Sequence, residues 1–366
     1  MLEINATETV REGSIFGQIK TMDHEQLVIC QDQATGLKAL IGIHNTVLGP
    51  ALGGTRMWPY ATEEEAITDV LRLSRGMTFK NSLAGLNLGG GKAVIIGDPK
   101  LKSEAFLRRF GRFVESLGGR YVTAEDVNMK TSDMEYIAME TRYVTGLPQI
   151  KGGAGDPSPV TAFGVYMGMK AAAKKAFGSD SLLGKKIGVQ GVGQVGKYLI
   201  NYLVKEGAEI LVTDIFEDKL REIATSTGAT VVDPQVIYDL PMDIYAPCAL
   251  GATINDQTID RLKCAVIAGG ANNQLKDEAK HGKILMEKGI IYAPDFLINA
   301  GGVINVGAEF YGDYNEDTVY AQTEKIYTTC LTILEKSENE NIPAQQAAIE
   351  AAKARIEAIG RVKLPY

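Results

Sequence analysis

Two lysines and one aspartate in the first part of the chain have the chemistry of a proton-transfer site. Lys80 and Lys92 lie in RGMTFKNSLAGLNLGGGK, a largely apolar and glycine-rich stretch, and Asp126 follows in TAED. A lysine beside another cation in a poorly solvated site can act as a base. The second lysine could hold a substrate carboxylate as a point charge, and Asp126 could exchange protons with a reacting nitrogen. Each charge alone is typical of a solvated surface, but together they favour a site.

The glycines before Lys92 do not form a nucleotide-binding P-loop. That motif requires a glycine five positions before its last glycine and a hydroxyl residue after the lysine, where this chain has Leu86 and Ala93. The order also differs, because a strand is expected after the glycines and not before them. The pattern predicts a glycine turn that enters a buried strand and places Lys92 at its start.

A second glycine cluster fits the G-x-G-x-x-G pattern of dinucleotide-binding folds. A predicted strand (186–190) precedes it, a helix follows, and Asp214 ends the next strand near the expected offset. In this pattern the first glycine makes the turn, the second admits the pyrophosphate and the third allows close helix–strand contact. The predicted cofactor-binding residues are Gly191, Val192, Gly193, Gln194, Val195 and Gly196.

Asp214 predicts the choice of cofactor. A carboxylate at the end of this strand accepts hydrogen bonds from the adenine ribose hydroxyls and repels a 2′-phosphate. No arginine follows in IFED to reverse that preference. The sequence therefore favours NAD over NADP.

The elements that must position these residues fall into two groups. Short β-branched strands alternate with amphipathic helices up to a glycine- and proline-rich junction at 145–159, and a stricter strand–helix alternation follows. We predict an α/β fold with an N-terminal substrate and oligomerisation domain and a Rossmann-type NAD-binding domain. The expected bounds are 1–148, completed by a C-terminal helix at 336–366, and 149–335.

Composition excludes several classes of function. The net charge is −7 and no long basic stretch occurs, which argues against nucleic acid and anionic membranes as partners. No apolar run approaches a bilayer span, and the polar N-terminus lacks a signal-peptide core, so we expect a cytoplasmic location. The four cysteines and three histidines are scattered, so no metal site is expected.

Several long segments resemble the motifs of the glutamate, leucine, phenylalanine and valine dehydrogenase family, and the leucine-specific branch looks most similar. The segments are GPALGGTRMWPY, RGMTFKNSLAGLNLGGGKAVIIGDP, YVTAEDV, GDPSPVTA, GVGQVG, APCALGATIND, AGGANNQL and YAPDFLINAGGVINV. They are spread over nearly the whole chain. The family forms homo-oligomers, often octamers, and the resemblance implies the same here.

The resemblance also implies roles for individual residues. Lys80 resembles the lysine that binds the substrate α-carboxylate, Lys92 the catalytic lysine that activates water, and Asp126 the proton-transferring acid. The remaining residues with an implied place near the substrate or nicotinamide are Gly53, Gly54, Asn273 and Thr161.

The same resemblance implies an aliphatic substrate pocket. Glutamate enzymes of the family carry a lysine before the Gly-Gly pair, where this chain has Leu52, which cannot stabilise a γ-carboxylate. The other implied pocket residues are Ala124, Val303 and Val306, and phenylalanine enzymes tend to have glycine in place of Ala124. We therefore expect reversible NAD-dependent deamination of L-leucine to its 2-oxo acid, with isoleucine and valine as secondary substrates. A valine or phenylalanine dehydrogenase remains an alternative, as does a catalytically silent NAD-binding protein.

Overall fold

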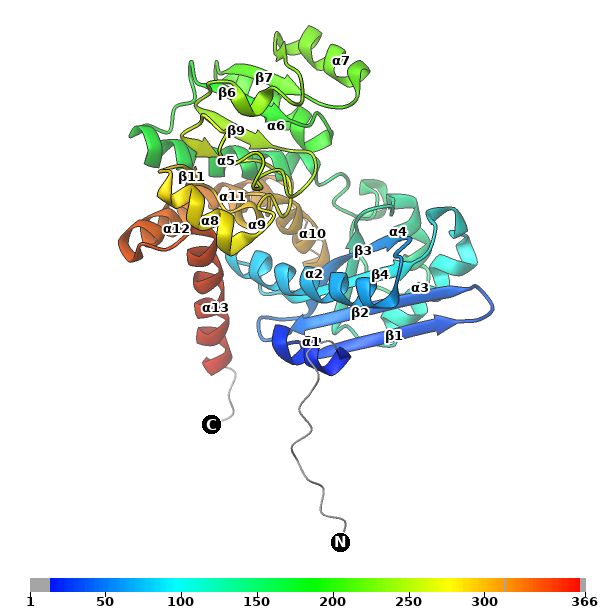
Figure 1. The fold of residues 1–366 in the computed structure, drawn as a ribbon. Helices are drawn as coiled ribbons and strands as arrows, with labels where there is room; N and C mark the ends of the chain where they lie inside the picture. The colour runs from blue at the N-terminus through cyan, green and yellow to red at the C-terminus, as the bar shows by residue number, and fades with distance from the viewer. Residues whose placement is uncertain (1–13, 313, 363–366) are drawn as a thin grey trace. The chain divides into compact units, whose positions relative to one another are not determined.

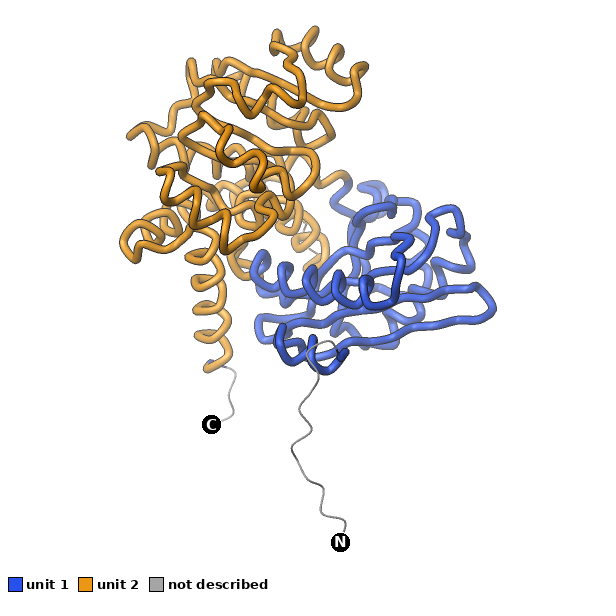
Figure 2. Tube along the Cα trace, in the orientation of Figure 1, with its two compact units in different colours: residues 1–81, 87–155, 362–366 blue, residues 82–86, 156–361 orange. Residues whose placement is uncertain are grey.

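The computed structural model describes residues 14–312 and 314–362, which form two compact units (Figure 2). Unit 1 consists of Met1–Asn81, Asn87–Gly155 and Val362–Tyr366, and unit 2 of Ser82–Leu86 and Asp156–Arg361. The main division falls inside the predicted junction, seven residues beyond the expected bound at 148. Within the described ranges, no helix is long and apolar enough to cross a membrane.

Unit 1 is built on a mixed five-stranded sheet (Figure 1). In spatial order its strands are β1 (Gln26–Asp32), β2 (Leu37–Asn45), β4 (Gly89–Ile96), β3 (Ala51–Trp58) and β5 (Tyr121–Glu125). β3 runs parallel to both β4 and β5, whereas β2 runs antiparallel to β1 and β4. The strands that carry Lys92 and lead into Asp126 therefore flank β3 on either side.

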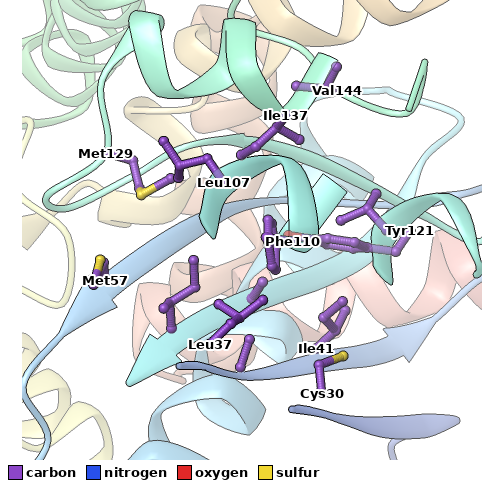
Figure 3. Packing of buried hydrophobic residues seen from close by; sticks show 14 of the residues in the cluster. Cys30, Leu37, Ile41, Met57, Leu107, Phe110, Tyr121, Met129, Ile137 and Val144 are labelled. Carbon is purple, nitrogen blue, oxygen red and sulfur yellow. The ribbon is translucent and has the colours of Figure 1, made fainter. Parts of the chain in front are cut away.

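Helices pack on both faces of this sheet. α3 (Glu104–Glu115) and α4 (Thr131–Ala138) cover one face, and their apolar side chains meet Ile41, Met57 and Tyr121 in the main core of the unit (Figure 3). On the opposite face α2 (Glu63–Leu83) packs its residues Val70 and Leu71 against β2 and β4. A short helix, α1 (Ile15–Met22), adds its apolar residues to this second cluster.

The glycines before Lys92 belong to the strand β4 itself, so the predicted turn is wrong. A side chain at Gly89 would lie 2.0 Å from the Asn45 carbonyl oxygen, and one at Gly91 would lie 2.7 Å from the Tyr121 ring. Neighbouring backbone and side chains occupy the space that Cβ atoms would need. Glycine is required here by close packing across the sheet and not by a reversal of the chain.

Unit 2 is built on a six-stranded sheet in which every strand pair is parallel. In spatial order the strands are β11 (Ile291–Tyr292), β10 (Val266–Ile267), β9 (Ile244–Pro247), β6 (Lys186–Gln190), β7 (Glu209–Thr213) and β8 (Thr230–Val231). Taken from β6 in chain order, this is the 3-2-1-4-5-6 arrangement of doubly wound dinucleotide-binding sheets. The predicted Rossmann-type domain is confirmed.

The helices of unit 2 are longer on average than its strands. They are α5 (Ser158–Phe177), α6 (Gln194–Lys205), α7 (Glu217–Thr227), α8 (Glu278–Glu287), α9 (Asp295–Ile298), α10 (Gly301–Tyr311), α11 (Glu316–Glu324), α12 (Ile326–Glu340) and α13 (Ala344–Val362). α5 lies at the centre of the helical layer and packs against α6, α10, α11 and α12. Most of its buried residues are alanine, glycine or valine, which allow such close contacts.

The end of the chain differs from the prediction of one helix that completes the first domain. Residues 336–362 form the end of α12 and all of α13, separated at Asn341, whose φ of 52° ends α12 in the left-handed region. Gln345 Nε2 donates to Glu278 of α8, and Lys336 of α12 pairs with Glu350. These contacts attach α13 to unit 2, to which the chain belongs as far as Arg361.

Candidate functional site

The strand register of unit 1 places Lys92 and Asp126 on the same face of the sheet. Leu52 of β3 is paired with Gly90 of β4, two residues before Lys92, and Gly54 with Ala124 of β5, two residues before Asp126. Side chains two residues apart along a strand share a face. Val94, two residues beyond Lys92 on β4, packs with Val70 and Leu71 of α2. Lys92 and Asp126 therefore lie on the side of the sheet that α2 covers.

Lys92 and Asp126 form a close ion pair. Lys92 Nζ lies 2.8 Å from Asp126 Oδ2, and the Lys92 residue is only 5% exposed. Arg56 Nε donates to the same oxygen at 3.0 Å. Burial alone would raise the pKa of the Asp126 carboxyl, but the charges and hydrogen bonds of Lys92 and Arg56 hold it below its ordinary value. Asp126 is thus an anion held between two cations.

Arg56 is part of a longer polar network that the sequence did not predict. Its Nη1 donates to Asp69 Oδ2 on α2 at 3.0 Å, and the Tyr60 hydroxyl donates to that same oxygen at 2.5 Å. Burial lowers the pKa of Arg56, but the carboxylates of Asp126 and Asp69 raise it above its ordinary value. Arg56 lies within the quoted segment GPALGGTRMWPY, yet no spacing rule connects it with Asp126 or Asp69.

Gly53 and Gly54 bring β3 close to its neighbours. A Cβ atom at Gly53 would lie 1.7 Å from the Gly91 carbonyl oxygen, and one at Gly54 would lie 2.4 Å from the Glu125 carbonyl oxygen. The Tyr121 hydroxyl also donates to the Gly53 carbonyl at 2.6 Å. The Gly-Gly pair therefore has a packing role on both sides of β3, and its implied role toward a substrate remains a prediction.

The other predicted residues of unit 1 lie on the same side of the sheet. Leu52 and Ala124 are 1% and 7% exposed and share the face of Lys92. Lys80 is half-buried in the last turn of α2, the helix that covers this face. Lys92, Leu52, Ala124 and Asp126 thus share one face of the sheet, and Lys80 belongs to the helix that covers this face.

The glycine loop of unit 2 has the geometry of a dinucleotide site. Gly191 has a φ of 110° and leaves no room for a Cβ beside Ala249, and a Cβ at Gly196 would lie 2.1 Å from the Gly191 carbonyl oxygen. Gly193 differs, because a Cβ there would meet nothing within 4 Å. No protein neighbour explains that glycine, whereas a phosphate approaching the N-terminus of α6 does. The loop therefore fits a nucleotide cofactor.

Asp214 holds this loop from the end of β7. Its Oδ2 accepts from the Val192 backbone N–H at 2.7 Å, and its Oδ1 accepts from the Phe216 N–H at 3.1 Å. One carboxylate thus fixes the loop between β6 and α6 and the turn after β7. Each oxygen retains a lone pair with which it could accept from a ribose hydroxyl.

A buried amide holds the loop of Asn273. Asn273 has a φ of 52°, in the left-handed region that asparagine tolerates. The adjacent Gln274 is fully buried, and its side-chain amide donates to the carbonyls of Gly269 and Ala271. Its backbone N–H donates to an Asp295 carboxylate oxygen 2.9 Å away. The backbone around Asn273 is therefore tightly constrained.

Thr161 lies where α5 and the first turn of α10 meet, and Val303 and Val306 follow along α10. A Cβ at Gly301 would lie 2.1 Å from the Val160 carbonyl oxygen, and one at Gly302 would lie 2.8 Å from Thr161 Oγ1. This close crossing brings Thr161 beside the first turn of α10, which continues into Val303 and Val306. Thr161 Oγ1 also donates to the Pro157 carbonyl at 2.9 Å.

Known proteins resemble this chain along most of its length. Residues 24–143 match the family described as Glu/Leu/Phe/Val dehydrogenase, dimerisation domain, and residues 212–362 match Glutamate/Leucine/Phenylalanine/Valine dehydrogenase. The leucine dehydrogenase of Thermoactinomyces intermedius is 57% identical over 96% of both chains, and the valine dehydrogenase of Streptomyces virginiae is 50% identical over 91% of this chain and 94% of its own. The crystal structure of L-tryptophan dehydrogenase from Nostoc punctiforme has a TM-score of 0.84 and 44% identity, and covers 94% of this chain and 99% of its own.

Proposed function

Because the chain belongs to the glutamate/leucine/phenylalanine/valine dehydrogenase family, we propose that it catalyses the reversible NAD-dependent oxidative deamination of L-leucine. In this reaction L-leucine, NAD and water give 4-methyl-2-oxopentanoate, ammonium, NADH and a proton. Other branched-chain L-amino acids are secondary substrates. The observation that carries the proposal is the ion pair between the buried Lys92 and the partly exposed Asp126, with Nζ 2.8 Å from Oδ2.

Each member of this pair has a distinct task in the proposed chemistry. Asp126, held as an anion, takes a proton from the substrate ammonium group, which leaves the nitrogen lone pair free to assist loss of hydride from Cα. Lys92 releases its proton to solvent and, as the neutral amine, removes a proton from the water that attacks the resulting imino carbon. The ammonium cation that this forms stabilises the carbinolamine, and Asp126 returns its proton to the departing amine. Lys80, on the helix above the same face, holds the α-carboxylate.

The glycine loop and Asp214 would hold the dinucleotide. Bound NAD supplies the hydride acceptor. The amides at the start of α6 would bind the pyrophosphate and Asp214 the adenine ribose, while Thr161 and Asn273 would lie near the nicotinamide. The space at Gly193 and the carboxylate at Asp214 support this assignment and favour NAD over NADP.

Leucine is proposed as the main substrate on two grounds. The residue before the Gly-Gly pair is the buried Leu52, which offers no counter-charge to a substrate carboxylate. Ala124 on β5, which pairs with Gly54 on the same face, is also aliphatic. Val303 and Val306 of α10 would supply the remaining apolar surface. The relatives point the same way, since the leucine dehydrogenase named above is more similar to this chain than the valine dehydrogenase.

The decisive experiment measures NADH formation at 340 nm with a panel of L-amino acids. The panel contains leucine, isoleucine, valine, phenylalanine, tryptophan and glutamate, each with NAD and with NADP. We expect the highest kcat/KM with leucine and NAD. A preference for valine or phenylalanine would reassign the substrate, and no turnover with any amino acid would leave only a binding protein.

We also propose that the protein is a cytoplasmic homo-oligomer, with an octamer as the expected size. The match of residues 24–143 to a dimerisation domain supports self-association through unit 1. Light scattering of the purified chain gives the number of copies directly, and cell fractionation tests the location. A monomer at micromolar concentration would contradict the proposed assembly.

A further inference from the structure

Arg56, Asp69 and Tyr60 extend the Lys92–Asp126 pair into a polar network, and the chemistry proposed above gives these three residues no role. The network runs from Lys92 on β4 through Asp126 and Arg56 on β3 to Asp69 on α2, and Tyr60 completes it. The four ionised groups are two cations and two anions, so the network carries no net charge. The attraction between such charges offsets their loss of hydration only where their geometry is good and their hydrogen bonds are satisfied.

The two cations contact the same oxygen of Asp126. Lys92 Nζ and Arg56 Nε lie 2.8 and 3.0 Å from Oδ2. In the part of the chain that the structure describes, no hydrogen bond to Oδ1 is formed. The carboxylate thus has one oxygen held by protein and one that is not.

We propose that Arg56 is a positioning residue, which fixes Asp126 through Oδ2 and directs Oδ1 to the substrate nitrogen. This role rests on the proposed deamination. The proton moves from the substrate ammonium group to Oδ1, and no bond to Arg56 is made or broken. Asp69 accepts a hydrogen bond from Nη1 of the same guanidinium and so prevents it from rotating away from Asp126. Tyr60 fixes Asp69 in turn.

The groups that face Asp126 are few and come from every neighbouring strand. Lys92 and Arg56 are the cations, and the Tyr121 hydroxyl on β5 lies close enough to sense its charge. Glu125, the residue before Asp126, accepts a hydrogen bond from the Thr131 hydroxyl. Removing Arg56 would therefore leave Lys92 as the main cation beside the Asp126 carboxylate. With one stabilising charge lost, the pKa of the Asp126 carboxyl would rise.

The test compares Arg56→Gln, Arg56→Lys and Asp69→Asn with the wild type in steady-state deamination. For Arg56→Gln we expect a loss of about tenfold or more in kcat with a smaller change in KM for leucine. The acid limb of its pH–rate profile should move to higher pH by about one unit. Arg56→Lys restores the charge and should return the limb toward its original position, with only partial recovery of kcat. Asp69→Asn should shift both quantities in the same direction by less.

A matched control is available in unit 1. Arg108 also bridges two carboxylates, those of Glu104 and Glu140, but it lies on the outer side of α3. Arg108→Gln should leave kcat and the pH profile unchanged. NADH binding and melting temperature are measured for every variant, because a merely structural role would lower stability without moving the pH limb.

The outcomes separate this inference from the proposed function. A wild type without amino-acid dehydrogenase activity overturns both. An active wild type with an unshifted limb and near-normal kcat in Arg56→Gln overturns only the role of Arg56. If Arg56→Gln does not fold, the pH limb of Asp69→Asn decides, and a profile identical to the wild type refutes the inference.

Discussion

His24 should make unit 1 lose stability in mild acid. Its residue is 8% exposed, and Nε2 lies 3.0 Å from the Leu71 carbonyl oxygen and 2.8 Å from Ser74 Oγ. Nδ1 is buried without a hydrogen-bond partner, so a second ring proton would have no acceptor. Burial, aided by the positive charge of Arg75 and opposed by the Leu71 hydrogen bond, lowers the pKa of His24 from 6.5 to about 4.

The size of the effect follows from proton linkage. Between these two pKa values the unfolded chain binds a proton that the folded chain does not, so stability falls as the pH drops from about 6.5 toward 4. Each pKa unit corresponds to about 1.4 kcal/mol, which makes the full loss about 3 kcal/mol. Between pH 7 and pH 5 the loss should be about 2 kcal/mol.

The only tryptophan of the chain provides a local assay. Trp58 ends β3 in unit 1, so its fluorescence reports the unfolding of the unit that contains His24. Urea titrations at pH 7 and pH 5, at one protein concentration, are compared for the wild type, His24→Gln and His281→Gln. The wild type should lose about 2 kcal/mol more than His24→Gln between the two pH values. His281 lies in unit 2, so His281→Gln should behave as the wild type. Equal pH dependence in wild type and His24→Gln would refute the reasoning.

The remaining predictions concern the proposed reaction. Lys92→Ala should lose about 100-fold or more of its turnover while NADH binding, followed by fluorescence, is retained, and near-normal turnover would remove Lys92 from the mechanism. Lys80→Ala should raise KM for leucine by about tenfold or more, because a hydrogen bond to a charged group is lost, and an unchanged KM would place the carboxylate anchor elsewhere. NADP should be a poor cofactor for the wild type. In Asp214→Ala the value of kcat/KM with NAD, divided by that with NADP, should be smaller than in the wild type. Equal wild-type rates with both cofactors would contradict the role of Asp214.

The Rossmann-type unit was predictable because its signals are local. A strand with β-branched residues, the three-glycine motif and a helix follow one another within residues 186–205. All three signals therefore lie in one short segment of the chain. Strand–helix alternation then fixes a parallel sheet with right-handed crossovers. Single short strands such as β10 are harder to delimit, since two residues carry no periodicity.

Strand β3 was not predicted, because its sequence runs against strand propensity. Gly53 and Gly54 weaken an isolated strand, yet β3 is the central strand of its parallel set. The reason is tertiary, since the Gly91 carbonyl oxygen occupies the place of a Gly53 side chain. The prediction that the final helix completes the first domain differs from the structure for a similar reason. Its apolar spacing predicts a helix correctly, but not that Gln345 and Glu350 attach it to unit 2.

Residue types alone predicted only part of the candidate site. Lys92 and Asp126 were selected because their chemistry suits proton transfer, but Arg56 and Asp69 look like ordinary surface charges in the sequence. Arg56 is 70 residues from Asp126 and 13 from Asp69, distances at which no helical or strand period applies. The register brings them together, because β3 lies between β4 and β5 and α2 covers the same face. Any residue on that face of β3 near the ends of these parallel strands must lie beside Asp126, and a charged one must find a partner or lose stability. Once the register is known, the network around Arg56 follows from the need to neutralise charges that the sheet has already placed side by side.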